Sequence, residues 1–304
     1  MQGDKSPAIV QAMSRLSRRG ALARLGKFCA EASAFLLLLL LSVAPLANAV
    51  PQSSRSFEAQ PAQFDTAAEA RLVVLINQAR SAGGVPPLTV DQRLTQAARK
   101  HTELMVQQSA LSHQFPGEPP LPTRFANEDL PSDHEGENVD FSPDAASAHQ
   151  ALMDSPPHRQ NILDPKYNAV GVGVVRSGDN IFVTEDFAHI LPQYSEPQAE
   201  AKVQAAIAQY ERSHKLPPPP RTSQTQLRHL ACNMALNDSL DASAALSLPG
   251  VHEVFAWTAG DPAELPKGIA RVLSPSPAGY SLGACFAPSV SHPGGLYWLI
   301  MVTY

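Results

Sequence analysis

The sequence predicts an α+β fold, because amphipathic helices come first along the chain and a pair of strands follows them. Apolar residues recur at helical spacing from about residue 65 onward, and a Val- and Gly-rich strand pattern appears near residue 170. Since the two strands are adjacent rather than separated by a helix, the pattern does not favour a parallel βαβ sheet. The length of 304 residues predicts roughly two domains, which we place at 65–192 and 195–304.

The first 49 residues are expected to be a signal peptide. Basic residues precede Phe35–Leu41, a run of one phenylalanine and six leucines, and small residues end at Ala47-Asn48-Ala49. The apolar stretch 32–46 is short for a membrane span, which needs about 20 residues; an uncleaved anchor is the alternative. Cleavage near Ala49 would leave a secreted or periplasmic bacterial protein with no membrane span.

Two helices are predicted after a flexible lead-in over residues 50–64. The first starts at Asp65-Thr66, with Glu69 as the partner in a capping box, and ends at Gly83-Gly84. The second is capped by Asp91 and presents one apolar face to the core. These two helices should form part of the core of the first domain.

A third helix is predicted to begin at Ser142, with Pro143 at its first helical position. The stretch Gly136-Glu137-Asn138 before it is expected to lie in a polar loop. Strands are predicted at 169–176 and 181–188, joined by a turn over Ser177–Asn180.

Glu185 is the most informative single position, because it shares one strand face with Ile181, Val183 and Phe187. A carboxylate in line with apolar side chains is desolvated, partnered or lining a cavity. We therefore expect the pKa of Glu185 to lie above that of an ordinary glutamate.

Other chemistry-bearing residues gather in short patches: Ser112-His113, 136–138 and the stretch 155–163 with His158. Two histidines and two carboxylates that met in one hollow could hold a divalent metal such as zinc, calcium or magnesium. Taken singly, each histidine is as easily structural. His101, on the apolar face of the second helix, is expected to be a packed, hydrogen-bonded core residue.

Together these patches resemble a known family. Leu75–Leu88 (LINQARSAGGVPPL), Leu111-Ser112-His113, Gly136-Glu137-Asn138 and SPPHRQNIL, running into Val170–Gly173, are similar to segments of the CAP superfamily. That superfamily comprises the cysteine-rich secretory, antigen 5 and pathogenesis-related proteins, and the similarity is to its bacterial SCP-like branch. The resemblance covers about residues 66–189 and implies an α-β-α sandwich with a large open cleft.

The resemblance also implies three residues of the cleft, which are His113, Glu137 and His158. We add Asn138, Arg159 and Glu185 as candidate cleft residues, and expect Asn138 to brace a loop by bonding nearby backbone groups. The candidate metal ligands are His113, Glu137, His158 and Glu185. A glutamate that some relatives carry on the helix before the second histidine is absent here, where the chain reads Leu152-Met153-Asp154-Ser155. Glu185 could supply that second carboxylate; otherwise three ligands with open positions are expected.

Residues 195–304 resemble a shortened repeat of the first domain. Residues 203–231 repeat the helix, proline-marked turn and helix of 73–97, and 280–304 repeats the paired strands. Residues 195–304 lack counterparts of Gly-Glu-Asn and His-Arg-x-Asn, so a degenerate CAP-like repeat without cleft chemistry is one interpretation and an unrelated α+β tail is the other. Cys232 and Cys285 are expected to form a disulfide, as is usual after export.

Composition excludes several classes of function. A net charge of −5 and a pI near 6.0 argue against a nucleic-acid partner. The first domain contains no cysteine, which excludes a thiol protease, and no nucleophile-elbow sequence supports a serine hydrolase.

Three functions are left. The favoured one is a secreted binding module whose cleft takes a small apolar ligand, a peptide or a cell-envelope component, with or without a metal. A metal-dependent hydrolase using His113, His158 and Glu137 is the second, and an extracellular scaffold is the third. We favour binding over catalysis, because a fold resemblance gives no catalytic warrant.

Overall fold

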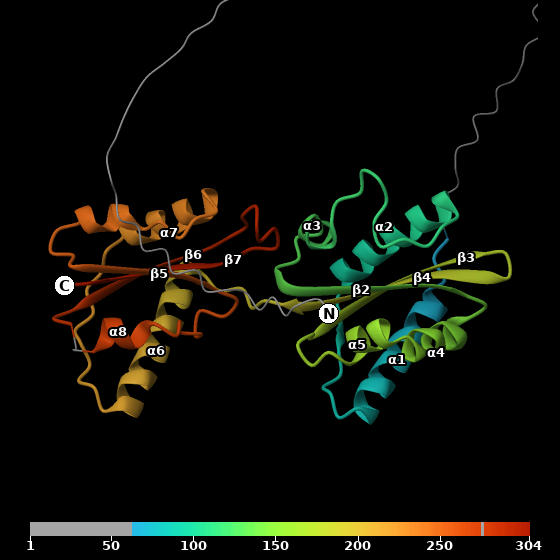
Figure 1. Cartoon of the computed structure of the whole chain (residues 1–304), viewed down its shortest axis with the longest axis horizontal. Helices are drawn as coiled ribbons and strands as arrows, with labels where there is room; N and C mark the ends of the chain where they lie inside the picture. The colour runs from blue at the N-terminus through green and yellow to red at the C-terminus, as the bar shows by residue number, and fades with distance from the viewer. Residues whose placement is uncertain (1–62, 275–276) are drawn as a thin grey trace, which may run out of the picture. The chain divides into compact units, whose positions relative to one another are not determined.

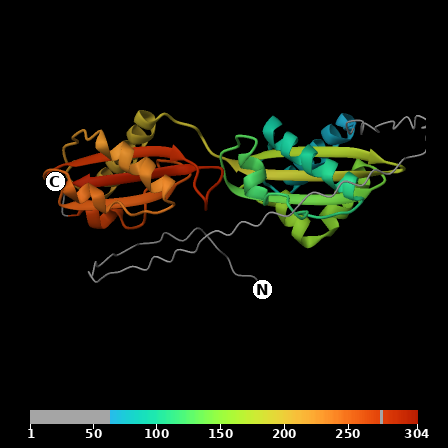
Figure 2. The same cartoon turned by 90° about the horizontal axis from the view of Figure 1, so that it is seen from above.

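The computed structural model describes residues 63–274 and 277–304 (Figure 1). The predicted signal peptide and nearly all of the predicted lead-in lie outside these residues. The described chain forms two β-sheets, a mixed one of four strands and an antiparallel one of three, each with helices on both faces. In Figure 2 the strands of each sheet run side by side. The fold is α+β, as predicted.

The first sheet has the strand order β1-β3-β4-β2. β1 and β3 are parallel, whereas β3–β4 and β4–β2 are antiparallel. The strands are β1 (Thr89–Val90), β2 (Ser132–Ser142), β3 (Ala169–Ser177) and β4 (Asn180–Ile190), and the helices are α1 (Thr66–Ala82), α2 (Gln92–Gln108), α3 (Leu121–Ala126), α4 (Ala145–Asp154) and α5 (Pro156–Leu163). Helix α2 covers one face, and α1, α4 and α5 cover the other, so that helices, sheet and helices form three layers (Figure 1).

Asp65 and Asp91 cap the first two helices, but the predicted capping box with Glu69 is absent, because the Glu69 carboxylate binds Arg99 instead. The Asp65 side chain accepts a hydrogen bond from the Ala68 N–H at 3.0 Å, and Asp91 accepts one from the Arg93 N–H at 2.8 Å. The predicted start of the third helix at Ser142 is wrong. α4 begins at Ala145 with Asp144 as its N-cap, because Ser142 is still paired to β4 as the last residue of β2.

The assignment of Gly136-Glu137-Asn138 to a polar loop is also wrong. These residues lie in the middle of β2, where they pair with Phe187, Asp186 and Glu185 of β4. The β2 sequence, SDHEGENVDFS, has few of the apolar and β-branched residues that mark a strand. Long-range pairing therefore makes this segment a strand, at the edge of the sheet.

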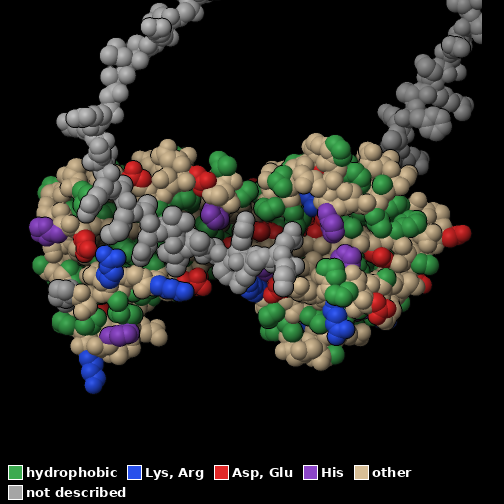
Figure 3. Space-filling model, in the orientation of Figure 1, with side chains coloured by type: hydrophobic (Ala, Val, Ile, Leu, Met, Phe, Trp, Pro, Cys, Tyr) green, Lys and Arg blue, Asp and Glu red, His purple; other side chains and the backbone are tan. Residues whose placement is uncertain are grey.

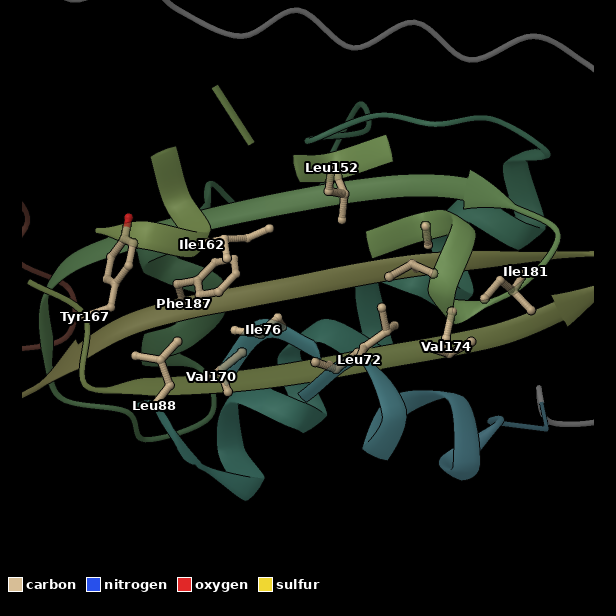
Figure 4. Packing of buried hydrophobic residues seen from close by; sticks show 14 residues of the cluster. Leu72, Ile76, Leu88, Leu152, Ile162, Tyr167, Val170, Val174, Ile181 and Phe187 are labelled. Atoms are coloured by element: carbon tan, nitrogen blue, oxygen red, sulfur yellow. The ribbon is translucent and has the colours of Figure 1, made fainter. Parts of the chain in front are cut away.

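The core beneath the sheet contains Leu72 and Ile76 of α1, Val170 of β3 and Phe187 of β4 (Figure 4). On the opposite face, α2 packs closely on β3 at Gly171. A Cβ added there would lie 2.1 Å from the Leu94 carbonyl carbon, so only glycine permits this approach. Both faces of the sheet are thus covered by helices.

The second sheet has the order β5-β7-β6, with both pairs antiparallel. Its elements are α6 (Glu196–His214), α7 (Gln226–Leu236), a 3-10 turn (Ser243–Ser247), β5 (Glu253–Ala259), α8 (Ile269–Leu273), β6 (Tyr280–Ala287) and β7 (Leu296–Thr303). The two helices and two closing strands expected from the sequence are present; β5 and α8 were not foreseen. Cys232 of α7 and Cys285 of β6 form the predicted disulfide, with Cα atoms 5.2 Å apart.

Three features of residues 195–304 correspond to features of the first part. β5-β7-β6 repeats the antiparallel order β2-β4-β3. Buried positions on the first helix of each part follow the same spacing: Glu69, Leu72, Ile76 and Arg80 in α1 correspond to Glu200, Val203, Ile207 and Glu211 in α6. A glycine of β6, Gly283, lies against the Leu227 backbone of α7, as Gly171 lies against Leu94 of α2.

Candidate functional site

His113 and Glu137 are in direct contact at the edge of the first sheet. His113 follows the C-terminus of α2, and its Nδ1 donates a hydrogen bond of 2.9 Å to Glu137 Oε1. The His113 side chain is 59% exposed, whereas that of Glu137 is only 3% exposed. The bond to Glu137 raises the pKa of His113. The carboxylate therefore orients an imidazole that still faces solvent.

His158 lies close to this pair. It is half-buried in α5, a helix that starts with Pro156 and Pro157 at its first two positions. The His158 ring centroid is 6.4 Å from that of His113, with 45° between the ring planes. Burial, and next the charge of His113, lower the pKa of His158. Figure 3 shows histidine side chains together on the face of the molecule over β2.

Arg124 of α3 holds Glu137 from the other side. Its Nη2 donates to Glu137 Oε2 at 2.7 Å and to the His113 carbonyl at 3.3 Å, and its Nη1 donates to Glu118 at 3.3 Å. One guanidinium thus fixes both the carboxylate and the backbone that carries the imidazole. Sequence reasoning missed Arg124, because nothing in the local pattern links residue 124 to the Gly-Glu-Asn strand.

His101 is the packed core histidine that was predicted. It is almost fully buried, with its Nδ1 2.6 Å from Glu118 Oε1 and its Nε2 2.7 Å from the Ser112 carbonyl oxygen. It thereby ties α2 to the segment that carries His113.

Asp186 is a second residue that sequence reasoning missed. It pairs with Glu137 in the β2–β4 register, is fully buried, and has no hydrogen-bond partner for either carboxylate oxygen among the described residues. Burial, and next the charge of Glu137, raise the pKa of Asp186 well above its ordinary value. A buried acid thus lies behind the exposed histidine.

Glu185 lies on the opposite face of the sheet from Glu137. It pairs with Asn138, and successive side chains on a strand point to opposite faces. Glu185 is fully buried, and burial raises its pKa to about 7, in the predicted direction. The expectation that Glu185 would share one hollow with Glu137 does not agree with this placement, since the sheet separates the two carboxylates.

Asn138 connects β2 to α5. Its Nδ2 donates to Glu185 Oε2 at 3.1 Å and to the His158 carbonyl at 3.2 Å. Asn161 of α5 donates to Asn138 Oδ1 at 2.9 Å and to the Glu137 carbonyl at 3.1 Å. Asn138 is therefore a brace between distant segments, set in a strand rather than in the expected loop, and it fixes the backbone of His158.

Gly136 has a steric role in the same strand. A Cβ at this position would lie 2.2 Å from the Tyr167 hydroxyl, and Tyr167 is itself stacked between His134 and Phe187. Arg159, the remaining predicted cleft residue, is exposed.

The predicted metal ligands are not close enough together to enclose an ion. In the described residues, the only group of three His, Cys, Asp or Glu whose ligand atoms all lie within 4.8 Å is Glu196, Cys232 and Cys285. The two cysteines of that group form the disulfide. His113, Glu137 and His158 would have to move to bind one ion together.

Comparison with known proteins finds a family match for part of the chain. Residues 73–187 match the family model for the cysteine-rich secretory protein family, CAP. The chain is 31% identical over 116 residues to the uncharacterized protein YkwD of Bacillus subtilis, covering 37% of this chain and 44% of that protein. Residues 73–187 therefore match a CAP domain, and a bacterial protein is among the relatives, in agreement with the resemblance.

Two solved structures are also similar. An extracellular protein with an SCP domain from Bacillus anthracis is 27% identical, with 40% of each chain covered and a TM-score of 0.38. Na-ASP-1 is 9% identical, with 81% of this chain and 91% of that chain covered and a TM-score of 0.46. The match thus spans less than half of the Bacillus relatives. Within residues 63–274 and 277–304, no helix is both long and apolar enough to cross a membrane.

Proposed function

We propose that the CAP domain is the ligand-binding module of an exported bacterial protein, and that it binds a small apolar or peptidic ligand beside His113, Glu137 and His158. The contact between His113 and Glu137 carries this proposal. It presents an oriented, solvent-facing imidazole, with a second imidazole 6.4 Å away. Such a pair offers hydrogen bonds and flat apolar rings to a ligand at the same place.

The charges around Glu137 favour binding over hydrolysis. A hydrolase would use Glu137 as a general base toward a metal-bound water. Both Glu137 oxygens already accept hydrogen bonds, one from His113 and one from Arg124. With both oxygens engaged, Glu137 is better suited to orient His113 than to accept a proton.

If a divalent metal binds, His113, Glu137 and His158 would hold it only after moving closer together and after Glu137 gave up a bond to His113 or Arg124, and they would leave positions open for a ligand. Their nitrogen and oxygen donors suit zinc. The metal would polarise a bound carbonyl group or a water molecule.

We also propose that residues 195–304 are a degenerate CAP-like unit, supported by the matched strand order and helix spacing. At the β2 position this unit has β5, whose sequence EVFAWTA contains no Gly-Glu-Asn. The ligand-binding role therefore belongs to the first unit. Export would fit both the signal peptide that the sequence predicts and the disulfide.

Metal analysis and mass spectrometry of material extracted from the purified chain test the proposed function. His158→Ala is compared with His252→Ala, an exposed histidine of the second part that serves as a matched control. An apolar or peptidic molecule that co-purifies with the native chain and the control, but not with His158→Ala, is the expected result.

Hydrolysis of a peptide or ester panel that depends on metal and is lost in His158→Ala would instead establish the hydrolase. No ligand and no turnover in any variant would leave the scaffold and overturn the binding proposal.

A further inference from the structure

The outer edge of β2 passes beside the histidine pair. β2 is the last strand of its sheet, and β4 pairs with only one side of it. The Glu137 carbonyl accepts a hydrogen bond from Asn161 of α5 rather than from β4. The backbone N–H and C=O groups of Glu137 therefore point away from β4, toward the unpaired side of β2.

The same direction applies to every second residue of the strand, because backbone N–H and C=O groups alternate between its two sides. Val139 and Phe141 thus direct their N–H and C=O groups outward, while Asn138 and Asp140 pair with β4. The register of β3 on the other side of β4 is consistent with this alternation. The Val170 and Val174 carbonyls of β3 accept hydrogen bonds from outside the β3–β4 pair, so they point away from β4.

The outward groups of Val139 and Phe141 accept and donate no hydrogen bond within residues 63–274 and 277–304. Phe141 is 42% exposed, although its ring contacts Phe182 at 4.5 Å between centroids, whereas Val139 is only 8% exposed. The edge therefore reaches solvent at Phe141, and an unpaired strand edge that reaches solvent is a template for another strand, which proteins ordinarily protect. Here Asn161 protects it only at Glu137.

We propose that an extended peptide binds as an added strand along the β2 edge at Val139–Phe141, beside His113 and His158. The inference rests on the proposed function and names its ligand. Main-chain hydrogen bonds supply the affinity in such complexes, and alternate side chains supply the specificity. Only an extended backbone presents donors and acceptors at the spacing of this edge, which a small apolar molecule cannot match.

The two faces of β2 indicate the side chains of that peptide. On the α2 face it would meet Val139 and Phe141, which are apolar and pack with Met105 and Phe182. On the other face it would meet Asp140, a half-buried carboxylate whose Oδ2 accepts a hydrogen bond from Ser142 Oγ. A peptide that alternates apolar and basic residues is complementary to both faces.

The test uses the full exported chain with the acetylated, amidated hexapeptide Val-Lys-Val-Lys-Val-Lys and its Val-Glu counterpart. Amide hydrogen exchange followed by NMR should show new protection at Val139 and Phe141 when the Val-Lys peptide is added. Asn138 and Asp140 should already be protected by β4. N-methylation of one alternate set of peptide residues should abolish binding, and that of the other set should leave it unchanged.

Val139→Pro removes one outward N–H without breaking a bond to β4, and proline is tolerated at such edge positions. It should weaken binding about tenfold, the effect of one backbone hydrogen bond, whereas the matched control Val139→Ala retains the N–H and should change affinity less. Asp140→Asn should weaken the Val-Lys peptide about two- to fivefold and should not weaken the Val-Glu peptide.

Three results would overturn the inference: no binding by either peptide at millimolar concentration, binding without new protection at Val139 and Phe141, or equal loss from both N-methylated sets. Protection at these amides that needs no peptide and rises with protein concentration would place a second copy of the chain there, and would also overturn it. A co-purified ligand that depends on His158, found together with any of these results, would leave the proposed function intact.

Discussion

Replacing Arg124 by glutamine tests how the site is held. The Arg124 side chain is only 10% exposed, and it joins two carboxylates, Glu137 and Glu118, whose side chains are 3% and 4% exposed. A third carboxyl group, Asp186, lies opposite Glu137 in the register. The substitution therefore leaves buried acids without the only arginine that contacts both Glu118 and Glu137 in the described chain.

The expected cost follows from this burial. Breaking a buried ion pair by removing one partner destabilises a protein by about 3–5 kcal/mol, because the remaining charge has lost both water and its partner. A surface pair would cost less than about 1 kcal/mol. We expect Arg124→Gln to lower the free energy of unfolding by about 3 kcal/mol at pH 7. The loss should shrink at acid pH, where carboxylates are protonated.

Urea unfolding between pH 4 and pH 8 measures this effect, with Arg159→Gln as control because Arg159 is exposed. NMR titration of His113 gives a second measurement, which would not change if Arg124 only stabilised the fold. The charge of Arg124 lowers the pKa of His113, so that pKa should rise in Arg124→Gln. A loss below about 1 kcal/mol, or an unchanged His113 titration in a folded variant, would refute the reasoning.

Three further predictions concern other parts of the fold. The pKa of Glu185 is about 7 in the folded chain, against an ordinary 4.5. Between these pH values the folded state therefore binds a proton that the unfolded state has lost, so the free energy of unfolding falls as pH rises through that range. Glu185→Gln should remove this loss and raise the free energy of unfolding by up to about 3 kcal/mol at pH 8 relative to the native chain. Urea unfolding at pH 5 and pH 8 would measure the effect, and an equal difference between variant and native chain at both pH values would contradict it. Glu137→Gln should bring the pKa of His113 down toward its ordinary value, since the bond to Glu137 is what raises it; proton NMR checks this, and an unmoved titration would exclude Glu137 as the cause. Cys232→Ser, which opens the disulfide to Cys285 across 53 residues, should cost roughly 3–4 kcal/mol of unfolding free energy in the chain-entropy model, and unchanged thermal unfolding would contradict that.

Local features of the fold could be predicted from the sequence. Asp65 and Asp91 cap their helices through side-chain bonds to N–H groups two or three residues ahead. The pairing of Ser177 with Asn180 likewise closes the hairpin expected from the turn sequence. Such signals depend on neighbouring residues alone, so no tertiary contact is needed to recognise them.

The strand β2 could not be recognised in this way. Its residues are mostly polar, and it is a strand because β4 offers a complete row of backbone partners. The wrong predicted start of α4 has the same cause. Because residues 136–138 are predicted as a loop, nothing in the prediction places Ser142 in a strand, and it is assigned to the start of the helix. Once Glu137 and Asn138 are in a strand, they must face opposite sides of the sheet.

Residue chemistry and the resemblance to a family thus sufficed to single out His113, Glu137 and His158, which the fold brings to one strand edge. Only the tertiary structure decided that Glu185 lies on the opposite face of the sheet from Glu137, and that Arg124 and Asp186 lie next to Glu137. The reason is physical: a side chain's type is a property of its own residue, whereas its neighbours, burial and charge environment are fixed by strands and helices distant along the chain.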